Sequence, residues 1–406
     1  MSAVPLTSAP FVVVAMLVAQ TIVSMGTLTM PAIAPALARS FGVDASAIGY
    51  QVSIVYAGAM ASAALGGSVV RRIGAGRTTQ AALAAVAIGI ALATSANVAV
   101  LMVASVLLGL GYGLSNPAAS ELLVRYTPAS RRNLIFSLKQ TGVPLGGIAA
   151  ALVAPSVASA FGWRAALWLV AAVAVAMAML LQSPRRRWDD LPGAPLPLSV
   201  ASLFGGVALI WRERPLRYLS LMALCFAGVQ LCVMTFTVTL LVSEPHYTLV
   251  QAGLVLSAVQ LAGAVGRIAW GWAADRTGAS ASVLLVLGAV MLAANLAVTQ
   301  VDASWSLAWT LVAFVAMGAS AIGWNGVFLA EVARLAPPGQ ASTATGGALF
   351  FTFAGVLIGP SAFAAAYAQL QSYTGTFFVA AVLAVAGMAL VTLARAAIRR
   401  GEPFRA

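Results

Sequence analysis

The sequence has little charge, and most of what it has is positive. Only 8% of its 406 residues are Asp, Glu, Lys or Arg, against roughly 25% in soluble domains. Hydrophobic residues make up 61%, and they form repeated apolar runs of about 20 residues, the length of a bilayer-spanning helix. This composition excludes a chain of soluble domains and predicts an all-α membrane protein.

Residue types that often carry chemistry are also scarce. The one histidine, His246, falls in a predicted loop. The two cysteines, Cys225 and Cys232, lie on one predicted helix about 10 Å apart, too far to form a disulfide. We find no metal-ligand cluster, no nucleophile constellation and no phosphate-binding loop. The sequence therefore predicts no cofactor, no bound metal and no enzymatic activity.

The apolar runs predict twelve membrane spans. They are expected at 10–33, 46–69, 78–96, 98–123, 134–157, 165–182, 216–242, 249–272, 280–300, 304–330, 343–367 and 374–395. Every third span is almost purely apolar and is expected to face lipid, whereas the other eight carry polar side chains that can line a cavity.

The net charge of +12 lies mainly in the gaps between spans. If the N-terminus is cytoplasmic, nearly all arginines outside the spans fall on the cytoplasmic side, and only Arg39 and Arg164 lie opposite. This distribution follows the positive-inside rule. It predicts an inner-membrane protein with both termini in the cytoplasm and basic gaps that contact lipid, and it argues against a nucleic-acid partner.

The chain is expected to form two six-helix halves, 1–182 and 216–395, with a linker at 183–215 and a basic tail at 396–406. A shift of 209 residues aligns Gly109 with Gly318, and Asn116 with Asn325. A repeat of this kind, with sites near the bilayer midplane, is one known transporter architecture. The apolar linker piece 198–211 is too short to span and is expected to lie at the membrane surface.

The end of the eighth predicted span carries a specific motif. Gly271, Asp275, Arg276 and Gly278 reproduce the pattern G-x-x-x-D-R-x-G, and the chain thereby resembles the major facilitator superfamily. The resemblance extends over the whole chain. It implies a monomeric twelve-helix transporter that moves a small molecule by alternating access of its halves.

The matching gap after the second span departs from that pattern, because Arg71, followed by Arg72, stands where the family usually has Asp. Such an Asp favours the positive N-terminus of a neighbouring helix. The resemblance therefore gives Asp275 a gating contact with the fifth span, whose start carries Arg131. A local pair with Arg276 is the alternative. Arg71 is not expected to make the equivalent carboxylate contact with the eleventh span.

Two cations lie inside predicted spans. Lys139, the only lysine, is about 8 Å inside the fifth span, and Arg267 lies at a similar depth in the eighth. A buried cation is costly and usually functional. The position of Arg267 resembles the anion-binding Arg of monocarboxylate and oxalate transporters, and the segment from Lys139 to Gly147 is similar to cyanate-permease-like porters. Together they predict a small organic anion as the substrate, and specifically a carboxylate.

Further candidates for the cavity wall are polar or aromatic residues within the spans: Tyr56, Asn116, Gln140, Gln260, Trp324 and Asn325. Each has a competing explanation as an interhelical contact or a packing residue. Lys139 and Arg267 are long enough to extend toward the membrane surface, and Glu121 could neutralise Lys139.

The residues do not specify how transport is coupled to protons or to another ion. Glu121 is the candidate proton carrier, and proton symport, anion exchange and uniport all remain compatible with the residues. The alternative function is proton-coupled export of hydrophobic or cationic compounds. The segment from Gly142 to Gly147 only loosely resembles the corresponding antiporter element, and Ser105 stands where such antiporters often have Arg.

Overall fold

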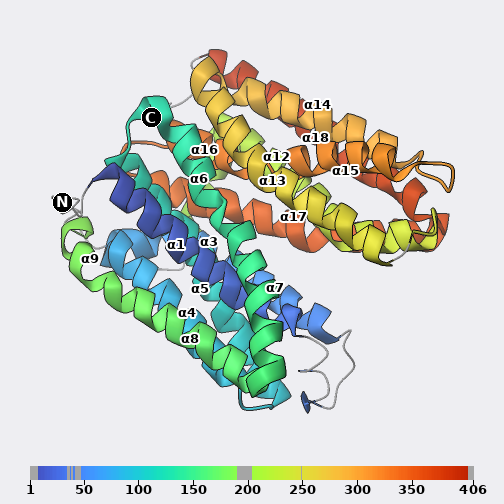
Figure 1. Cartoon of the computed structure of the whole chain (residues 1–406). Helices are drawn as coiled ribbons and strands as arrows, with labels where there is room; N and C mark the ends of the chain where they lie inside the picture. Colours follow the sequence, from blue (N-terminus) through green and yellow to red (C-terminus); the bar gives the residue numbers. More distant parts are fainter. Residues whose placement is uncertain are drawn as a thin grey trace, which may run out of the picture. The chain divides into compact units, whose positions relative to one another are not determined.

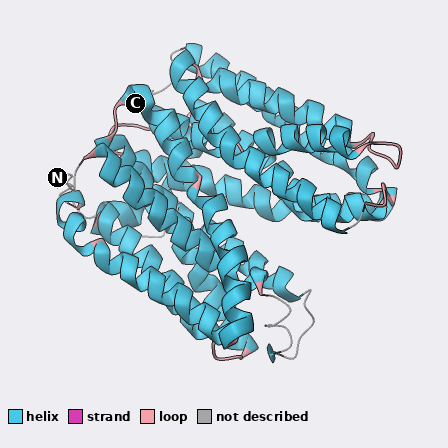
Figure 2. Cartoon of the chain, in the orientation of Figure 1, coloured by secondary structure: helices cyan, strands magenta, loops and turns pink. Residues whose placement is uncertain are grey.

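The protein is built from helices joined by short turns (Figures 1 and 2). The structure, a computed structural model, describes residues 8–33, 37, 40–41, 47–189, 204–247 and 249–400. No strand occurs among these residues. Twelve helical segments within them are long and apolar enough to cross a membrane. The predicted all-α membrane fold with twelve spans is confirmed.

The helices follow the predicted spans closely. The first six spans are α1 (Ala9–Ala32), α3 (Ala47–Ile73), α4 (Ala75–Ala93), α5 (Val98–Tyr126), the pair α6 (Arg132–Gln140) and α7 (Gly142–Phe161), and α8 (Trp163–Leu180). The last six are α12 (Arg214–Ser243), α13 (Leu249–Thr277), α14 (Ser280–Val298), the pair α15 (Leu307–Ala321) and α16 (Asn325–Leu335), α17 (Ala341–Leu370) and α18 (Tyr373–Arg399). Three short helices are also found among the described residues: η1 (Ala129–Arg131), α9 (Gln182–Trp188) and α11 (Gly205–Arg212).

The chain forms two compact units that do not coincide with the two halves of the sequence. The first unit contains Met1–Ala129, Lys139–Leu209 and Ala336–Phe350. The second contains Ser130–Leu138, Ile210–Leu335 and Phe351–Ala406. Each unit therefore includes one helix start from the other half of the sequence: α6 begins in the second unit, and α17 begins in the first.

The fifth span breaks at Thr141, between α6 and α7. Pro144 explains the break, because a proline has no N–H for the carbonyl four residues earlier and its ring collides with that carbonyl. The carbonyl in question belongs to Gln140. The break near Pro144 places Lys139 and Gln140 at the end of α6.

Aligned glycines of the two halves make equivalent close contacts. A side chain at Gly109 would collide with the carbonyl oxygen of Val55 on α3, and one at Gly318 would collide with the carbonyl oxygen of Val259 on α13. Each glycine thus allows two helix backbones to approach closely, as in other membrane bundles.

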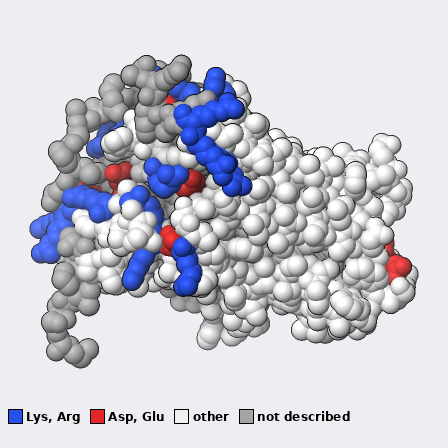
Figure 3. Space-filling view, turned by 90° about the horizontal axis from the view of Figure 1, so that it is seen from above, with Lys and Arg blue, Asp and Glu red and all other residues white. Residues whose placement is uncertain are grey.

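The outer surface is apolar. On the face drawn in Figure 3, nearly all Lys and Arg side chains in view gather at one end, and most of the remaining face is uncharged. Large apolar side chains stand exposed along α8 and α18, for example Met179, Leu180, Phe378 and Val382. Residues 198–203 of the expected surface helix lie outside the described residues, and the rest of that segment belongs largely to α11.

Candidate functional site

Lys139 lies inside the first unit in a shell of amide oxygens. Its side chain is only 2% exposed. The ammonium Nζ donates to Gln20 Oε1 at 2.6 Å, to Asn116 Oδ1 at 2.5 Å and to Gln140 Oε1 at 3.3 Å. Amide oxygens satisfy hydrogen-bond donors, but they are neutral and leave the formal charge of the ammonium in place. Lys139 therefore does not extend to the membrane surface.

A second layer of hydrogen bonds orients this shell, which we call the amide cage (Gln20, Asn116 and Gln140). Ser115 Oγ donates to Gln20 Oε1 at 3.0 Å, and Gln20 Nε2 donates to Ser24 Oγ at 3.1 Å. A side chain at Gly142 would collide with Gln20, so this glycine lets α7 pack closely against α1 beside the cage. Gln20 and Ser115 were not among the predicted site residues.

An aromatic pair lies one helical turn from the cage along α5. The rings of Tyr56 and Tyr112 meet edge to face, with centroids 6.2 Å apart. Beside them is a small cavity of about 20 Å³, enough for about one water molecule, lined also by Thr27, Leu28, Val52 and Val55. Tyr112 precedes Asn116 by four residues, or about 6 Å of helix rise. The first unit thus has a cation and a small apolar cavity close together.

Arg267, in the second unit, is also 2% exposed, but it has a different kind of partner. Its Nε donates to the backbone carbonyl of Ile322 at 2.9 Å. Ile322 lies at the break between α15 and α16, where carbonyls lack their usual helical donors. Trp270, one turn further along α13, donates to the nearby carbonyl of Ala319. Arg267 thus stabilises the break between α15 and α16, which belong to the same unit as Arg267.

The remaining candidates in the second unit are spread over several helices. Gln260 is half-buried on α13. Asn325 Nδ2 donates to Gln230 Oε1 of α12 at 3.1 Å, which is an interhelical bond. Trp324 is fully buried, donates to the carbonyl of Ala321 and packs against Phe226.

Asp275 lies at the N-terminus of α6. Its carboxylate accepts hydrogen bonds from the backbone N–H groups of Asn133 at 3.0 Å and Leu134 at 2.8 Å, and from the Asn133 side chain at 2.8 Å. A side chain at Gly271 would collide with Ser137 of α6. These N–H groups have no acceptor inside the helix, and a carboxylate there is favoured by the helix dipole.

The arginines beside the expected gating contacts lie at the surface. Arg276 is exposed, and its guanidinium lies 5.3 Å from the centroid of the Trp272 ring. Arg72 and Arg131 are also exposed. Gly278 follows the end of α13 with φ of +62°, a left-handed conformation that favours glycine.

Arg71 and Glu121 lie at the start of α17, which belongs to the first unit. Arg71 Nη1 donates to Thr343 Oγ1 at 2.6 Å. Glu121 Oε2 accepts a hydrogen bond from the backbone N–H of Ser342 at 3.4 Å. No motif around Glu121 indicated a contact with the eleventh span.

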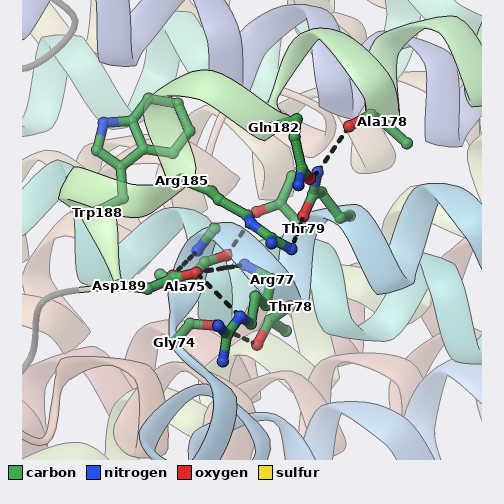
Figure 4. Close-up of polar contacts among 12 residues, drawn as sticks. Gly74, Ala75, Arg77, Thr78, Thr79, Ala178, Gln182, Arg185, Trp188 and Asp189 are labelled. Carbon is green, nitrogen blue, oxygen red and sulfur yellow. Dashed lines mark hydrogen bonds and ion pairs between the residues drawn. The ribbon is translucent and has the colours of Figure 1, made fainter.

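Asp189 makes a comparable contact at the N-terminus of α4 (Figure 4). Its carboxylate accepts from the backbone N–H of Gly76 at 2.7 Å and from that of Arg77 at 3.2 Å, and it also pairs with the Arg77 guanidinium at 3.9 Å. Burial raises the pKa of Asp189 above its ordinary value, while these partners oppose the shift. Asp189 thus ties the segment after α9 to the start of α4.

Comparison with known proteins agrees with this architecture. The sequence profile of the Major Facilitator Superfamily matches residues 13–360. The chain belongs to this superfamily. Its members are transporters that bind small-molecule substrates, so the coarse prediction of a transporter rather than an enzyme follows from the family.

Curated superfamily relatives match parts of the chain at low identity. An uncharacterized MFS-type transporter of Mycobacterium tuberculosis is 27% identical over 242 residues, which cover 59% of this chain and 52% of that protein. The 4-hydroxybenzoate transporter PcaK of Pseudomonas aeruginosa is 26% identical over 286 residues, covering 62% of this chain and 63% of that protein. The match thus spans about half to two thirds of these relatives' lengths.

Solved structures show the same fold over nearly the whole chain. The transporter FucP in its outward conformation matches with a TM-score of 0.75 at 16% identity, covering 94% of this chain and 98% of that one. The human organic anion transporter MFSD10 matches with a TM-score of 0.78 at 16% identity, covering 94% and 99%. At this identity the likeness establishes the superfamily fold alone.

Proposed function

We propose that the protein is a secondary transporter that moves a small organic anion, a carboxylate, by alternating access of its two six-helix halves. The observation that carries this proposal is the position of Lys139. A cation held 2% exposed among neutral amides and apolar helices is expensive, and such residues in membrane spans usually mark a substrate or ion path. An anion that binds there regains part of that cost through a charge-assisted hydrogen bond.

The cage suggests how an anion enters. The three donors of an ammonium match its three amide acceptors, so a carboxylate must replace one of them. Gln140 makes the longest of the three contacts, 3.3 Å against 2.6 Å and 2.5 Å. We expect the carboxylate to replace Gln140, while Gln20 and Asn116 keep the ammonium in position.

The aromatic pair of Tyr56 and Tyr112 favours a substrate with a flat apolar part, for which the small cavity beside the pair would have to widen. If the carboxylate of the substrate binds Lys139, an attached ring would lie about one helical turn away. There Tyr56 or Tyr112 can contact the face or edge of that ring. The PcaK relatives, which are named as transporters of the aromatic carboxylate 4-hydroxybenzoate, support this class. Arg267, Gln260, Trp324 and Asn325 remain proposed residues on the second half of the pathway.

Orientation and coupling complete the proposal. We propose that the protein acts as a monomer in the inner membrane. Both of its termini are expected in the cytoplasm, because the arginine-rich gaps then lie on the cytoplasmic side. Glu121 remains the proposed proton-coupling residue, although its contact with Ser342 also gives it a place in a gate.

A ligand screen followed by uptake tests the proposal. Purified protein is screened by thermal shift against aromatic and aliphatic carboxylates, inorganic anions and drug cations, since a ligand that binds the native state raises its apparent stability. The best ligand is then assayed for uptake into proteoliposomes, with Asp302→Asn as a control carboxylate variant in an exposed loop. Stabilisation and uptake of a carboxylate support the proposal. Stabilisation by apolar cations alone contradicts it and favours the exporter.

A further inference from the structure

One face of α18 carries an exposed apolar stripe along much of its length. Its members recur every three or four positions, as residues on a single helix face do: Phe378, Val382, Val385 and Ala389. The stripe runs for about 17 Å from Phe378 to Ala389, close to the roughly 15 Å of hydrocarbon in one leaflet of a bilayer. This length is suited to contact with the acyl chains of one lipid.

The same face becomes basic toward the end of the helix. An open groove of about 380 Å³ lies there, lined by Thr392, Arg395, Ala396, Arg399 and Arg400. Arg399 and Arg400 are exposed, and Arg395 is partly exposed. Within the part of the chain that the structure describes, no residue forms a hydrogen bond or an ion pair with any of these three guanidinium groups.

Arginines near span ends of the first unit are placed differently. Arg185, which follows α8, donates to the side chain of Gln80, and Arg125 donates to the carbonyl of Trp188. The helix dipole favours a cation in the last turn of α18, which accounts for Arg399, but Arg395 lies before that turn. Three neighbouring cations repel one another, so an anion in the groove would stabilise all three.

We propose that this groove binds the phosphate of an anionic phospholipid whose acyl chains lie along the apolar stripe of α18. Arginine binds phosphate through paired hydrogen bonds, and basic clusters at the membrane surface attract anionic lipids. Arg395 and Arg399 lie about 6 Å apart along the helix axis, so one phosphate can contact both guanidinium groups. The proposal does not depend on which substrate is carried.

The chemistry of the whole face selects the kind of ligand. A soluble phosphate would use only the basic groove, whereas one phospholipid covers the groove and the apolar stripe together. The ammonium of a zwitterionic headgroup needs an acidic partner, and the groove lining that the structure describes contains no carboxylate. Phosphatidylglycerol, which carries hydroxyl groups in place of the ammonium, avoids repulsion by the three arginines.

Native mass spectrometry of the full chain in detergent, titrated with phosphatidylglycerol, tests the site. The test variant combines Arg395→Gln, Arg399→Gln and Arg400→Gln. Because each basic residue near a membrane surface contributes to the binding of an anionic lipid, we expect this variant to weaken the tightest lipid binding about tenfold or more. Phosphatidylethanolamine should bind the native protein at least about tenfold more weakly than phosphatidylglycerol.

A matched control separates the groove from the general positive charge of the protein. It combines Arg186→Gln, Arg187→Gln and Arg212→Gln, three exposed arginines that do not line the groove. The control loses the same charge as the test variant. We expect its affinity for phosphatidylglycerol to change by about twofold or less, because salt screens exposed charges that lie away from the lipid.

A second variant tests the shape of the groove. Ala396→Phe fills the groove and keeps all three arginines, and it should weaken lipid binding by about threefold or more through poorer contacts with the phosphate. Inorganic phosphate at millimolar concentration should not displace the lipid. Equal losses in the two triple variants, equal affinity for the two lipids, native affinity in Ala396→Phe, or displacement by inorganic phosphate would overturn the proposal.

Discussion

Lys139 of the first unit and Arg267 of the second are both buried cations, but they have different kinds of partner. Each is predicted at a similar depth in its span, and each is 2% exposed in the structure. Lys139 contacts side-chain amides, which can rotate away. Arg267 contacts the backbone carbonyl of Ile322 at a helix break, and that carbonyl has no other helical donor.

This difference separates an exchangeable contact from a fixed one. A ligand can take the place of Gln140 beside Lys139 at the cost of one neutral hydrogen bond. Displacing Ile322 from Arg267 would leave a buried carbonyl without a donor, which costs about 1–3 kcal/mol. We therefore expect the first cation to dominate substrate binding and the second to contribute more to stability.

The largest expected effect is the loss of transport in Lys139→Met, which keeps the length of the side chain and removes its charge. Truncating one partner of a buried charge pair costs about 3–5 kcal/mol, so uptake of a carboxylate should fall by about 100-fold or more. Uptake into proteoliposomes measures this effect. Lys139→Arg, which keeps the charge, should retain more activity, and native uptake in folded Lys139→Met would contradict the anion site.

The second effect is on stability. Arg267→Met leaves the Ile322 carbonyl unpaired, and we expect it to lower the free energy of unfolding by about 1–3 kcal/mol. Thermal unfolding of the detergent-purified protein measures the change, with Lys139→Met as the matched variant. An unchanged Tm together with lost carboxylate binding would show that Arg267 is mainly a substrate ligand.

The third effect distinguishes the members of the amide cage. If substrate replaces Gln140, Gln140→Ala removes a competitor, and its KM should stay within about threefold of the native value. Asn116→Ala loses a contact that orients Lys139, and its KM should rise about tenfold. Paired uptake curves measure both values. A larger KM for Gln140→Ala than for Asn116→Ala would reverse the assignment.

The smallest effect is expected for Ser115→Ala. Ser115 donates to Gln20 rather than to Lys139, so its loss leaves all three ammonium contacts in place. A neutral hydrogen bond contributes about 0.5–1.5 kcal/mol, of which only part reaches the substrate. We expect KM to change by about twofold or less. A loss as large as that of Asn116→Ala would place Ser115 in direct contact with substrate.

The sequence predicts the membrane fold well because long apolar runs and the arginine-rich gaps are local signals. The break near Pro144 also has a local cause, because a proline disrupts the hydrogen bonding of its own helix. The partners of the buried cations are not. Gln20 lies 119 residues from Lys139, and the role of Arg267 depends on a break at Ile322 that lies inside a single predicted span, 304–330.

The carboxylates show the same limit. Among the described residues, Asp189, Glu244 and Asp275 each accept at least two backbone N–H groups at a helix start, and Glu121 accepts one. In the sequence, only Asp275 stood in a motif that suggested this role. The others meet helices that are distant in sequence, Asp189 at residues 76–77 and Glu121 at residue 342. In a chain with only ten acidic residues, this use leaves few carboxylates for proton coupling.

The most direct test of the central claim compares one carboxylate with its neutral amide. The best carboxylate from the thermal-shift screen and the corresponding amide are titrated by calorimetry into native protein and into Lys139→Met. We predict that native protein prefers the carboxylate by about tenfold or more and that Lys139→Met loses this preference. An equal preference for the carboxylate in both proteins would show that Lys139 does not bind the anion.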